Sequence, residues 1–450
     1  MKRLACLAVT FAALFVFFAG VFSWSGVSGQ SPKAKKSNAA AAYNPALAEA
    51  QRGEWSRWRG PNGDGISYET GLLTEWPAAG PPLVWRVKGL GGGYSSVAVA
   101  GRKIFTLGNK RGRNNMVCLK ALDGSILWTT PIGGGGGPNS TPTVDGEFVY
   151  GVSLDGDLAC CKVADGALAW AKNYEKDFGG RMMSSWGYSE SVLVDGDRLI
   201  CTPGGDEALL AALDKKTGDV IWKTAASAGS LGRRGEDGAG YASIVISNAG
   251  GVKQYVTLVG RGVVGVDAAT GKLLWSYNGV ANGTANIPTP LVAGDYVFCS
   301  SGYDTGSALL KLNRSRSGVD LQEVYFLAAN KMQNHHGGMI EKDGFVYCGT
   351  GHNNGFPLCI DSRTGQDAWR AGRGAGSGSA AIAYADGHLY FRYQDGTMAL
   401  IEANPKAYKL KSSFKIASNN GESWPHPVIA GGKLYLRDQD ELLCYDIKKK

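Results

Sequence analysis

The sequence predicts an all-β fold, an eight-bladed β-propeller, from three observations: its glycine content, a repeated hairpin pattern and a repeated pattern that ends in tryptophan. The chain has 450 residues, of which 66 are glycine, about 15% against a usual share of about 7%. Glycine costs helix interiors about 1 kcal/mol per position and suits tight turns between short strands. With 44% hydrophobic residues the chain can bury a large core, which excludes a disordered protein.

The first repeat is an apolar run, a turn that contains glycine and a second apolar run. Alternating β-branched and aromatic residues on both sides of such a turn predict a two-stranded hairpin. Eight copies occur, at residues 97–108, 142–153, 192–203, 244–260, 290–302, 339–351, 381–396 and 427–440. Each copy is expected to supply two strands of one blade.

The second repeat is an apolar strand, a D-x-x-T-G-type turn and a strand that ends in tryptophan. Five clear copies end at Trp128, Trp170, Trp222, Trp275 and Trp369, and two degenerate copies, at 311–326 and 401–414, lack the tryptophan. Between Trp128 and Trp275 the spacing runs from 42 residues (128 to 170) to 53 residues (222 to 275). Four strands per unit at this period are typical of a propeller blade.

The two ends of the chain carry complementary parts of one repeat unit. The last hairpin has no second repeat after it, while a lone strand around Trp85 precedes the first hairpin. We infer a ring closed by pairing of the N- and C-terminal strands, because this pairing removes an exposed sheet edge. The predicted propeller covers residues 85–450, and residues 55–84 form an N-terminal strap on it.

The N-terminus predicts export. Lys2 and Arg3 precede an apolar run from Leu4 to Phe22 and then a stretch of small residues, the pattern of a signal peptide over residues 1–29. The length of the apolar run approaches that of a membrane span, so an uncleaved signal anchor is the alternative. Residues 30–54 are expected to form a flexible linker. We expect a periplasmic or secreted monomer, with membrane contact only if the anchor remains.

The net charge gives no sign of a nucleic-acid partner. Lys and Arg exceed Asp and Glu by 47 to 39, a net charge of +8, but the positive charge is thinly spread, with short basic runs at the two ends and at Arg233–Arg234. No helix-turn-helix or zinc-finger spacing accompanies the charge. We therefore expect no binding of nucleic acid.

The repeat units resemble the pyrroloquinoline quinone (PQQ) repeat. That repeat is found in quinoprotein alcohol dehydrogenases and in the propeller subunit of the outer-membrane β-barrel assembly machinery. Secreted bacterial PQQ-like propellers, including polyvinyl-alcohol dehydrogenase-like proteins, are also similar at WSRWRGPNGDGIS (55–67), ETGLLTEWP (69–77), NGTANIPTP (282–290), QNHHGG (333–338) and WPHPVIAGGKLYLRDQDELLCYD (424–446). The resemblance covers about residues 55–450 and implies the fold, whereas the activity stays open.

The cysteines are expected to be free and buried. Cys118, Cys160 and Cys359 stand ten residues before a repeat tryptophan, a strand position that takes small side chains. Quinoprotein dehydrogenases carry a disulfide between neighbouring cysteines beside PQQ. Here the neighbours Cys160 and Cys161 lie within a predicted strand, where successive side chains point to opposite faces, so we expect no such bridge.

The candidate site is a mouth on the propeller axis. The segment that leads into the first strand of each blade (the lead-in segment) must lie near the axis, because that strand is innermost. Aromatic and polar groups that converge on a central concavity predict a ligand or partner site. The candidates are Tyr94, Asn139, Trp186, Tyr188, Glu190, Tyr241, Asn286, His335, His336, Trp424 and His426. The alternative is that they cap the ring by packing on each other.

No metal-ligand motif stands out. The sequence has neither a C-x-x-C nor an H-E-x-x-H pattern, and neighbouring side chains such as His335 and His336 diverge on an extended strand. We expect no metal site and no cofactor.

Three functions remain open. The favoured one is a non-catalytic exported scaffold, as in outer-membrane protein assembly, which binds envelope proteins or a small ligand at the mouth. The resemblance implies the alternative, a PQQ- and Ca²⁺-dependent alcohol dehydrogenase. Glu190, Glu236, Asp237 and Glu422 lie near the predicted mouth without the spacing of that family, so no catalytic residue is assigned. The third is binding of a carbohydrate or another small ligand.

Overall fold

The computed structural model describes residues 52–450, except 317 and 419–420. The predicted signal peptide or anchor (1–29) and nearly all of the predicted linker (30–54) lie outside the described residues. Within the described part of the chain, no helix is both long and apolar enough to cross a membrane.

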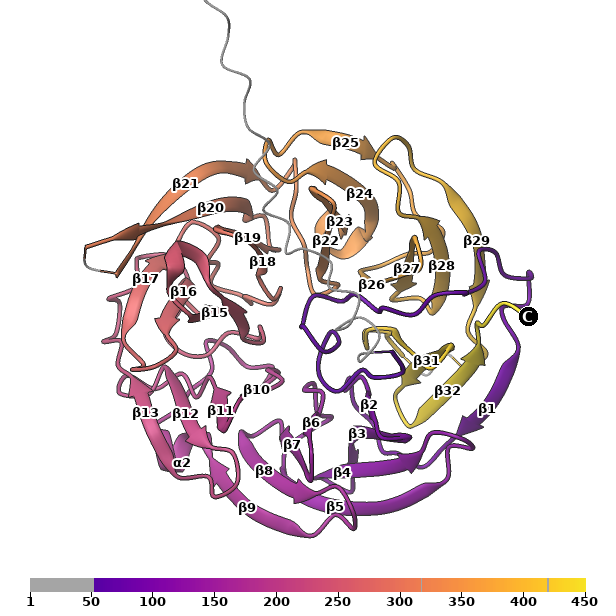
Figure 1. Cartoon of the computed structure of the whole chain (residues 1–450), viewed down its shortest axis with the longest axis horizontal. Helices are drawn as coiled ribbons and strands as arrows, with labels where there is room; N and C mark the ends of the chain where they lie inside the picture. The colour runs from indigo at the N-terminus through magenta and orange to yellow at the C-terminus, as the bar shows by residue number, and fades with distance from the viewer. Residues whose placement is uncertain (1–51, 317, 419–420) are drawn as a thin grey trace, which may run out of the picture. The chain divides into compact units, whose positions relative to one another are not determined.

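The described residues form eight four-stranded antiparallel sheets arranged as the blades of a propeller (Figure 1). Blade 1 comprises β2 (Ala98–Ala100), β3 (Lys103–Lys110), β4 (Arg113–Lys120) and β5 (Ile126–Gly134), and blade 2 comprises β6 (Thr143–Asp145), β7 (Phe148–Val152), β8 (Asp157–Lys162) and β9 (Leu168–Asn173). Blade 3 comprises β10 (Leu193–Asp195), β11 (Arg198–Cys201), β12 (Leu210–Asp214) and β13 (Val220–Thr224). Blade 4 comprises β14 (Val245–Ser247), β15 (Gln254–Val259), β16 (Gly262–Asp267) and β17 (Leu273–Tyr277). In each of them the first strand lies innermost and the fourth on the perimeter.

Blades 5 to 7 repeat this order. Blade 5 comprises β18 (Leu291–Ala293), β19 (Tyr296–Ser301), β20 (Gly306–Ser315) and β21 (Gly318–Ala328). Blade 6 comprises β22 (Met339–Lys342), β23 (Phe345–Thr350), β24 (Phe356–Asp361) and β25 (Asp367–Arg370). Blade 7 comprises β26 (Ala380–Ala385), β27 (His388–Tyr393), β28 (Thr397–Glu402) and β29 (Leu410–Lys415). Short helices α2 (Tyr174–Phe178), η1 (Ala249–Gly251) and η2 (His352–Asn354) lie in connections.

The last blade closes the ring as predicted. Its inner strands are β30 (Val428–Ala430), β31 (Lys433–Asp438) and β32 (Glu441–Asp446), and its outer strand is β1 (Leu83–Val87) from the N-terminal side. Strand β1 pairs antiparallel with β32, with Trp85 opposite Cys444. The eight-bladed fold and its closure by the two ends of the chain are therefore confirmed.

The repeat tryptophans join neighbouring blades. The indole Nε1 of Trp128 donates to the carbonyl of Val163 in the turn of the next blade, at 3.2 Å. A Cβ added at Gly166 of that turn would lie 2.6 Å from the Trp128 ring, so only glycine lets the indole approach. In degenerate blade 5, Tyr325 takes this role, because its hydroxyl donates to the carbonyl of Ser362 at 2.7 Å.

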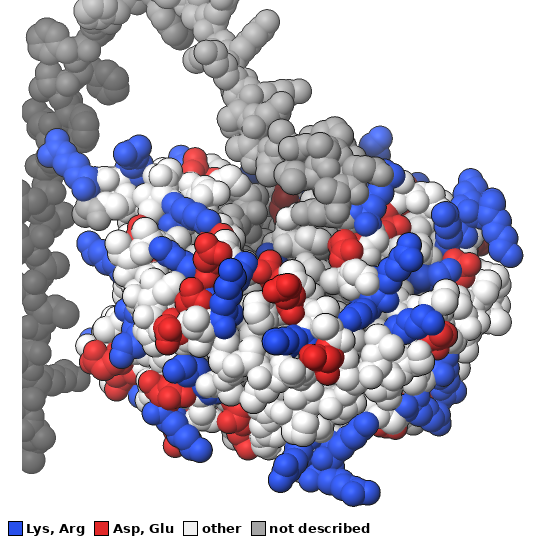
Figure 2. All heavy atoms as spheres, turned by 60° about the horizontal axis from the view of Figure 1, so that its bottom comes forward, with Lys and Arg blue, Asp and Glu red and all other residues white. Residues whose placement is uncertain are grey.

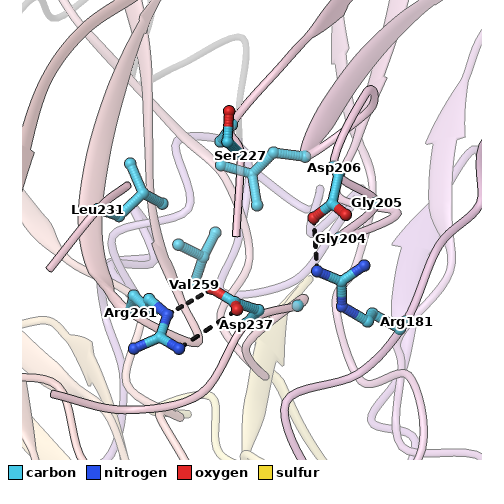
Figure 3. A pocket seen from close by; sticks show the side chains of 12 residues that line it. Arg181, Gly204, Gly205, Asp206, Ser227, Leu231, Asp237, Val259 and Arg261 are labelled. Atoms are coloured by element: carbon cyan, nitrogen blue, oxygen red, sulfur yellow. Dashed lines mark hydrogen bonds and ion pairs between the residues drawn. The ribbon is translucent and has the colours of Figure 1, made fainter. Parts of the chain in front are cut away.

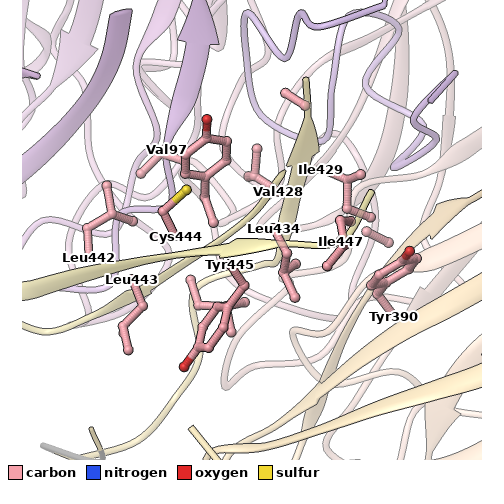
Figure 4. Close-up of a cluster of buried hydrophobic side chains, with 14 of the residues drawn as sticks. Val97, Tyr390, Val428, Ile429, Leu434, Leu442, Leu443, Cys444, Tyr445 and Ile447 are labelled. Atoms are coloured by element: carbon pink, nitrogen blue, oxygen red, sulfur yellow. The ribbon is translucent and has the colours of Figure 1, made fainter. Parts of the chain in front are cut away.

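A large hydrophobic cluster lies where the chain ends meet. Val97 of the first lead-in segment, Tyr390 of blade 7 and Val428 and Tyr445 of blade 8 are all buried in it (Figure 4). Strap residue Trp76 packs in the same cluster, 5.6 Å from the Tyr390 ring. Closure of the ring and docking of the strap thus share one core.

The strap crosses to the last blades on the inner side of the ring. Trp55 forms a bridge to Val99 of blade 1, and Ile66 forms one to Tyr384 of blade 7. The Ser67 hydroxyl donates to the carbonyl of Ile429 in blade 8 at 3.0 Å. Figure 1 shows this indigo segment beside the inner strands of the last blades.

The eight cysteines that the structure describes are buried and free. Cys160 and Cys161 pack in different hydrophobic clusters, as expected for neighbours on a strand. Burial raises the pKa of the Cys118 and Cys160 thiols to about 12, so both stay protonated and unreactive at neutral pH.

Candidate functional site

Eight rings lie along one face of the propeller, joined by ring contacts except between Tyr241 and Tyr303, where Tyr303 packs against the cluster of Met183, Tyr241 and Ala285. They come from lead-in segments and from loops that follow the second strands of blades, and antiparallel pairing brings these two kinds of loop to the same end of the sheets. In order of contact the rings are Trp186, Tyr241, Tyr303, His352, His335, His336, Trp424 and Tyr94 (the aromatic arc). Six of the eight belong to the predicted mouth residues.

One end of the arc presents an exposed indole on a fixed loop. The Trp186 side chain is 51% exposed, with its ring 6.2 Å from that of Tyr241. Asn139 Nδ2 donates to the Trp186 carbonyl at 3.1 Å and to Ser189 Oγ at 3.0 Å. The Tyr241 hydroxyl lies 2.6 Å from Ser184 Oγ. These side chains hold the loop, while the indole itself stays open to a partner.

The middle of the arc is a hydrogen-bonded imidazole group. His335 Nε2 lies 3.1 Å from the Tyr303 hydroxyl, and His335 Nδ1 lies 2.7 Å from Ser379 Oγ. The His352 ring lies 4.3 Å from His335 and 4.6 Å from Tyr303. Both ring nitrogens of His335 thus have partners, which fixes the orientation of the ring.

These imidazoles are neutral at physiological pH. Burial, followed by the neighbouring His336 and His352, lowers the pKa of His335 to about 2. Burial and the neighbouring His426 and His352 lower the pKa of His336 to about 3. The middle of the arc therefore offers uncharged rings, and none of them is a base at neutral pH.

The other end of the arc borders a hollow. Trp424 lies 5.0 Å from the His336 ring and 4.6 Å from the Tyr94 ring. Its Nε1 donates to Gln394 Oε1 at 3.0 Å. Gln394 also lines a hollow of about 230 Å³, together with Ser377, Gly378, Asp395, Gly421 and Glu422.

Glu190 lies beneath the surface of the mouth. Its Oε1 accepts hydrogen bonds from the Tyr174 hydroxyl and from the Thr202 backbone N–H, both at 2.7 Å. Its Oε2 has no hydrogen-bond partner among the described residues. Burial raises the pKa of Glu190 above its usual range. A buried carboxyl with these partners supports the fold of blade 3 rather than facing a ligand.

The other buried candidates also use their polar atoms in hydrogen bonds within the propeller. Tyr188 donates to the carbonyl of Pro203 at 3.0 Å. Asn286 Nδ2 donates to two backbone carbonyls of blade 4. His426 Nε2 donates to the His336 carbonyl at 3.1 Å, and its ring lies 4.4 Å from strap residue Trp58. The hydrogen bonds of these side chains to backbone carbonyls stabilise the loops of the mouth.

Sequence reasoning missed Tyr303, His352 and Gln394. All three follow the second strand of a hairpin, in the segments SGYDTG, GTGHNNG and RYQDG, whereas only lead-in segments were considered. Tyr303 and His352 have φ values of 54° and 52°, which non-glycine residues adopt uncommonly. The antiparallel pairing of hairpin strands, applied to the loop after each second strand, would have found them.

A smaller cavity lies between blades 3 and 4 (Figure 3). Its charged side chains pair internally, Arg181 with Asp206 at 2.5 Å and Arg261 with Asp237. The space of about 10 Å³ suffices for about one water molecule. Because its charges are already paired and its volume is small, this cavity does not suit an organic ligand.

PQQ with calcium, the cofactor pair of the alternative function, would need a set of oxygen ligands at the mouth. Calcium takes six to eight oxygen ligands, carboxylates among them. Glu190 is buried with a raised pKa, Asp237 pairs with Arg261, and Glu422 lies at the opposite end of the arc. Within residues 52–450, as far as they are described, no group of three His, Cys, Asp or Glu side chains could hold a metal ion. The residues do not fit this cofactor pair.

Surface charges of both signs are mixed on the face that Figure 2 shows. Lys and Arg side chains lie between Asp and Glu side chains there, rather than in one basic stripe. The excess of positive charge therefore forms no track on this face of the kind that nucleic-acid backbones require.

Comparison with protein families gives one match. A family model described as outer membrane protein assembly factor BamB matches residues 77–185 and 135–371. Together these matches span residues 77–371, which is more than half of the 450-residue chain. No curated protein sequence matches the chain significantly.

Solved structures of similar fold include a BamB protein and alcohol dehydrogenases. BamB from Moraxella catarrhalis has a TM-score of 0.57 at 14% identity, with 82% of this chain and 98% of that chain covered. A quinohemoprotein alcohol dehydrogenase from Pseudomonas putida HK5 has a TM-score of 0.63 at 14% identity, covering 92% and 83%. A europium-containing methanol dehydrogenase has a TM-score of 0.64 at 12% identity, covering 87% and 91%. At these identities the likeness shows the fold alone.

Proposed function

Because the chain belongs to the family described as outer membrane protein assembly factor BamB, we propose that it is a non-catalytic binding scaffold of the cell envelope. In this proposal the N-terminal signal exports the chain to the periplasm or beyond. The aromatic arc then binds a partner protein of the envelope.

The observation that carries the proposal is the exposed Trp186 indole on its fixed loop. Tryptophan and tyrosine are enriched among the residues that dominate binding energy at protein interfaces. A loop that is already held in place loses little conformational entropy when a partner binds. The adjoining rings of the arc extend this surface around the axis.

The alternative of a PQQ-dependent alcohol dehydrogenase has support from the fold of two structural neighbours. It finds no support in the candidate carboxylates of the mouth, because Glu190 is buried, Asp237 pairs with Arg261, and Glu422 lies at the opposite end of the arc from both. We therefore assign no catalytic residue.

The test is site-specific photo-crosslinking in envelope extract of the source cells. A photoreactive amino acid replaces Trp186 in one sample and Leu168 in the other. Leu168 is the matched control, because it is 54% exposed but lies on outer strand β9, away from the arc. We expect a discrete crosslinked envelope protein from position 186 only.

Two outcomes would overturn the proposal. One is the same crosslinked products from both positions. The other is a stable quinone absorbance and dye-linked alcohol oxidation after the purified protein is mixed with PQQ and Ca²⁺.

A further inference from the structure

The hollow at the Trp424 end of the arc has a lining of unusual chemistry for a protein-binding pocket. It lies between the lead-in segments of blades 7 and 8 and the loop after β27, and has a volume of about 230 Å³. Its lining comprises two glycines and the polar residues Ser377, Gln394, Asp395 and Glu422. None of these lining residues has an apolar side chain, so the hollow offers a ligand hydrogen-bonding groups rather than a hydrophobic surface.

The polar groups of the hollow are held in place. Asp395 Oδ2 accepts from the Ser377 hydroxyl at 3.2 Å and lies 3.3 Å from Lys415 Nζ. Asp395 Oδ1 accepts from the Thr397 backbone N–H at 2.9 Å. Burial acts to raise the pKa of Asp395, but the hydrogen bonds from Thr397 and the charge of Lys415 outweigh it and lower that pKa. Asp395 is therefore an ionised and fixed acceptor.

Gln394 links the hollow to the aromatic rings. Its Oε1 is taken by Trp424 Nε1 at 3.0 Å, which fixes the amide group and leaves its NH₂ as a donor. The Trp424 backbone N–H donates to the Glu422 carbonyl at 3.0 Å. The half-buried rings of Trp424 and Tyr94 stand 4.6 Å apart beside these residues. Fixed acceptors and one amide donor thus line one small space, and two aromatic rings adjoin it through Gln394 and Glu422.

We propose that this hollow is a binding subsite for a neutral saccharide unit. Sugar hydroxyls both donate and accept, so they pair with carboxylates, with an amide and with a serine hydroxyl. The apolar C–H face of a sugar ring packs on an aromatic ring. An apolar ligand would leave the polar groups of the hollow unpaired, and an anionic one would face two carboxylates.

This inference does not depend on the proposed protein partner. The subsite lies at the Tyr94 and Trp424 end of the arc, and the proposed protein anchor, Trp186, lies at the other end. Either site can fail its own test while the other passes.

The test is titration calorimetry of the full chain with three neutral hexasaccharides, of β-1,4-glucose, α-1,4-glucose and β-1,4-N-acetylglucosamine. We expect one of them to bind with a dissociation constant below 10 mM. E422Q and Y94A should each weaken that binding at least tenfold. The control E147Q, which changes an exposed glutamate next to β7 in blade 2, should leave it unchanged.

The melting temperature of each variant, measured in parallel, shows whether it is folded. Failure of all three saccharides to bind the wild-type chain would overturn the inference. So would equal affinities for wild type, E422Q and Y94A. Binding of spermidine by the hollow, lost in E422Q and without any saccharide binding, would also overturn it, because the site would then recognise cations.

Discussion

At the scale of single residues, burial decides what the mouth can do chemically. The lead-in segments predict His335, His336, Glu190 and His426 near the axis, but their titration could not be predicted from spacing. Burial lowers the pKa of His336 and His426 to about 3 and raises that of Glu190. The same environment therefore disfavours the charged forms of these imidazoles and of this carboxyl, which suits recognition better than proton transfer.

The first prediction concerns acid stability. In the unfolded chain the three histidines His335, His336 and His426 titrate near 6.5. As the pH falls below 6.5, the unfolded state binds protons that the folded state does not, so stability is complete above 6.5 and lost below it. We expect a loss of about 1.4 kcal/mol per histidine and per pH unit below 6.5. Urea unfolding at pH 7.5, 6.0 and 5.0 measures this loss, and His336→Gln should reduce its slope. Equal stability at pH 7.5 and 5.0 would contradict the neutral imidazoles.

The second prediction concerns Glu190, whose pKa shift has the opposite effect. Its raised pKa means that the unfolded state releases the proton first as the pH rises, so the carboxyl costs stability above its unfolded pKa of about 4.5. Glu190→Gln keeps the shape and removes the titration. We expect this variant to gain melting temperature relative to wild type at pH 8 and to gain less at pH 4. A constant difference at both pH values would show that folding does not raise the pKa of Glu190.

At the scale of elements, the repeat predicts the contacts between blades as well as the strands. The spacing of the tryptophans and of the T-G turns fixes both partners of the Trp128–Gly166 contact, and the structure brings them together. The replacement of tryptophan by Tyr325 in blade 5 was not predicted. A register shift opposite Leu309 and Leu310 of β20 puts Tyr325 at the position that the tryptophan occupies beside the equivalent shifts in other blades.

The third prediction tests this contact with a matched pair of glycines in blade 2. Gly146 and Gly166 both have positive φ, 56° and 77°, but a Cβ at Gly146 meets nothing within 4 Å, whereas one at Gly166 meets Trp128. Gly146→Ala should cost about 1 kcal/mol for the left-handed backbone alone. Gly166→Ala should cost a further 1 to 3 kcal/mol, roughly, for overpacking. Denaturant unfolding compares the two, and equal losses would mean that the tryptophan contact contributes nothing.

At the scale of the whole molecule, the fold could be predicted and the arrangement of the mouth only in part. Eight hairpins and an unpaired strand at each end leave one way to close the ring, and β1 pairs with β32 accordingly. The mouth depends on loops without a repeat, such as those of Tyr303 and His352, and on the strap residue Trp58 beneath His426. Hairpin pairing places the loops of Tyr303 and His352 on the face of the mouth, but the contacts of these side chains follow from packing between distant segments, which no local pattern encodes.

The fourth prediction concerns closure of the ring. Removal of residues 441–450 takes away β32 and leaves β1 without its partner. We expect loss of a single cooperative unfolding transition, because the large core cluster spans this blade. Removal of residues 448–450 is the control, since among described contacts it deletes little more than the bridge from Leu72 to Lys448 and one backbone hydrogen bond to Gly71. A truncated chain that melts like the full one would refute closure by β1.

The central claim, that the arc binds a partner through Trp186, is tested most directly by the affinity of Trp186→Ala for the protein that crosslinks at that position. Removal of an anchor at an interface costs about 2 kcal/mol or more, so we expect a dissociation constant raised about 30-fold. The melting temperature should stay the same, because half of this side chain is exposed. Leu168→Ala should change neither quantity. Unchanged affinity of Trp186→Ala, with the fold intact, would contradict the account.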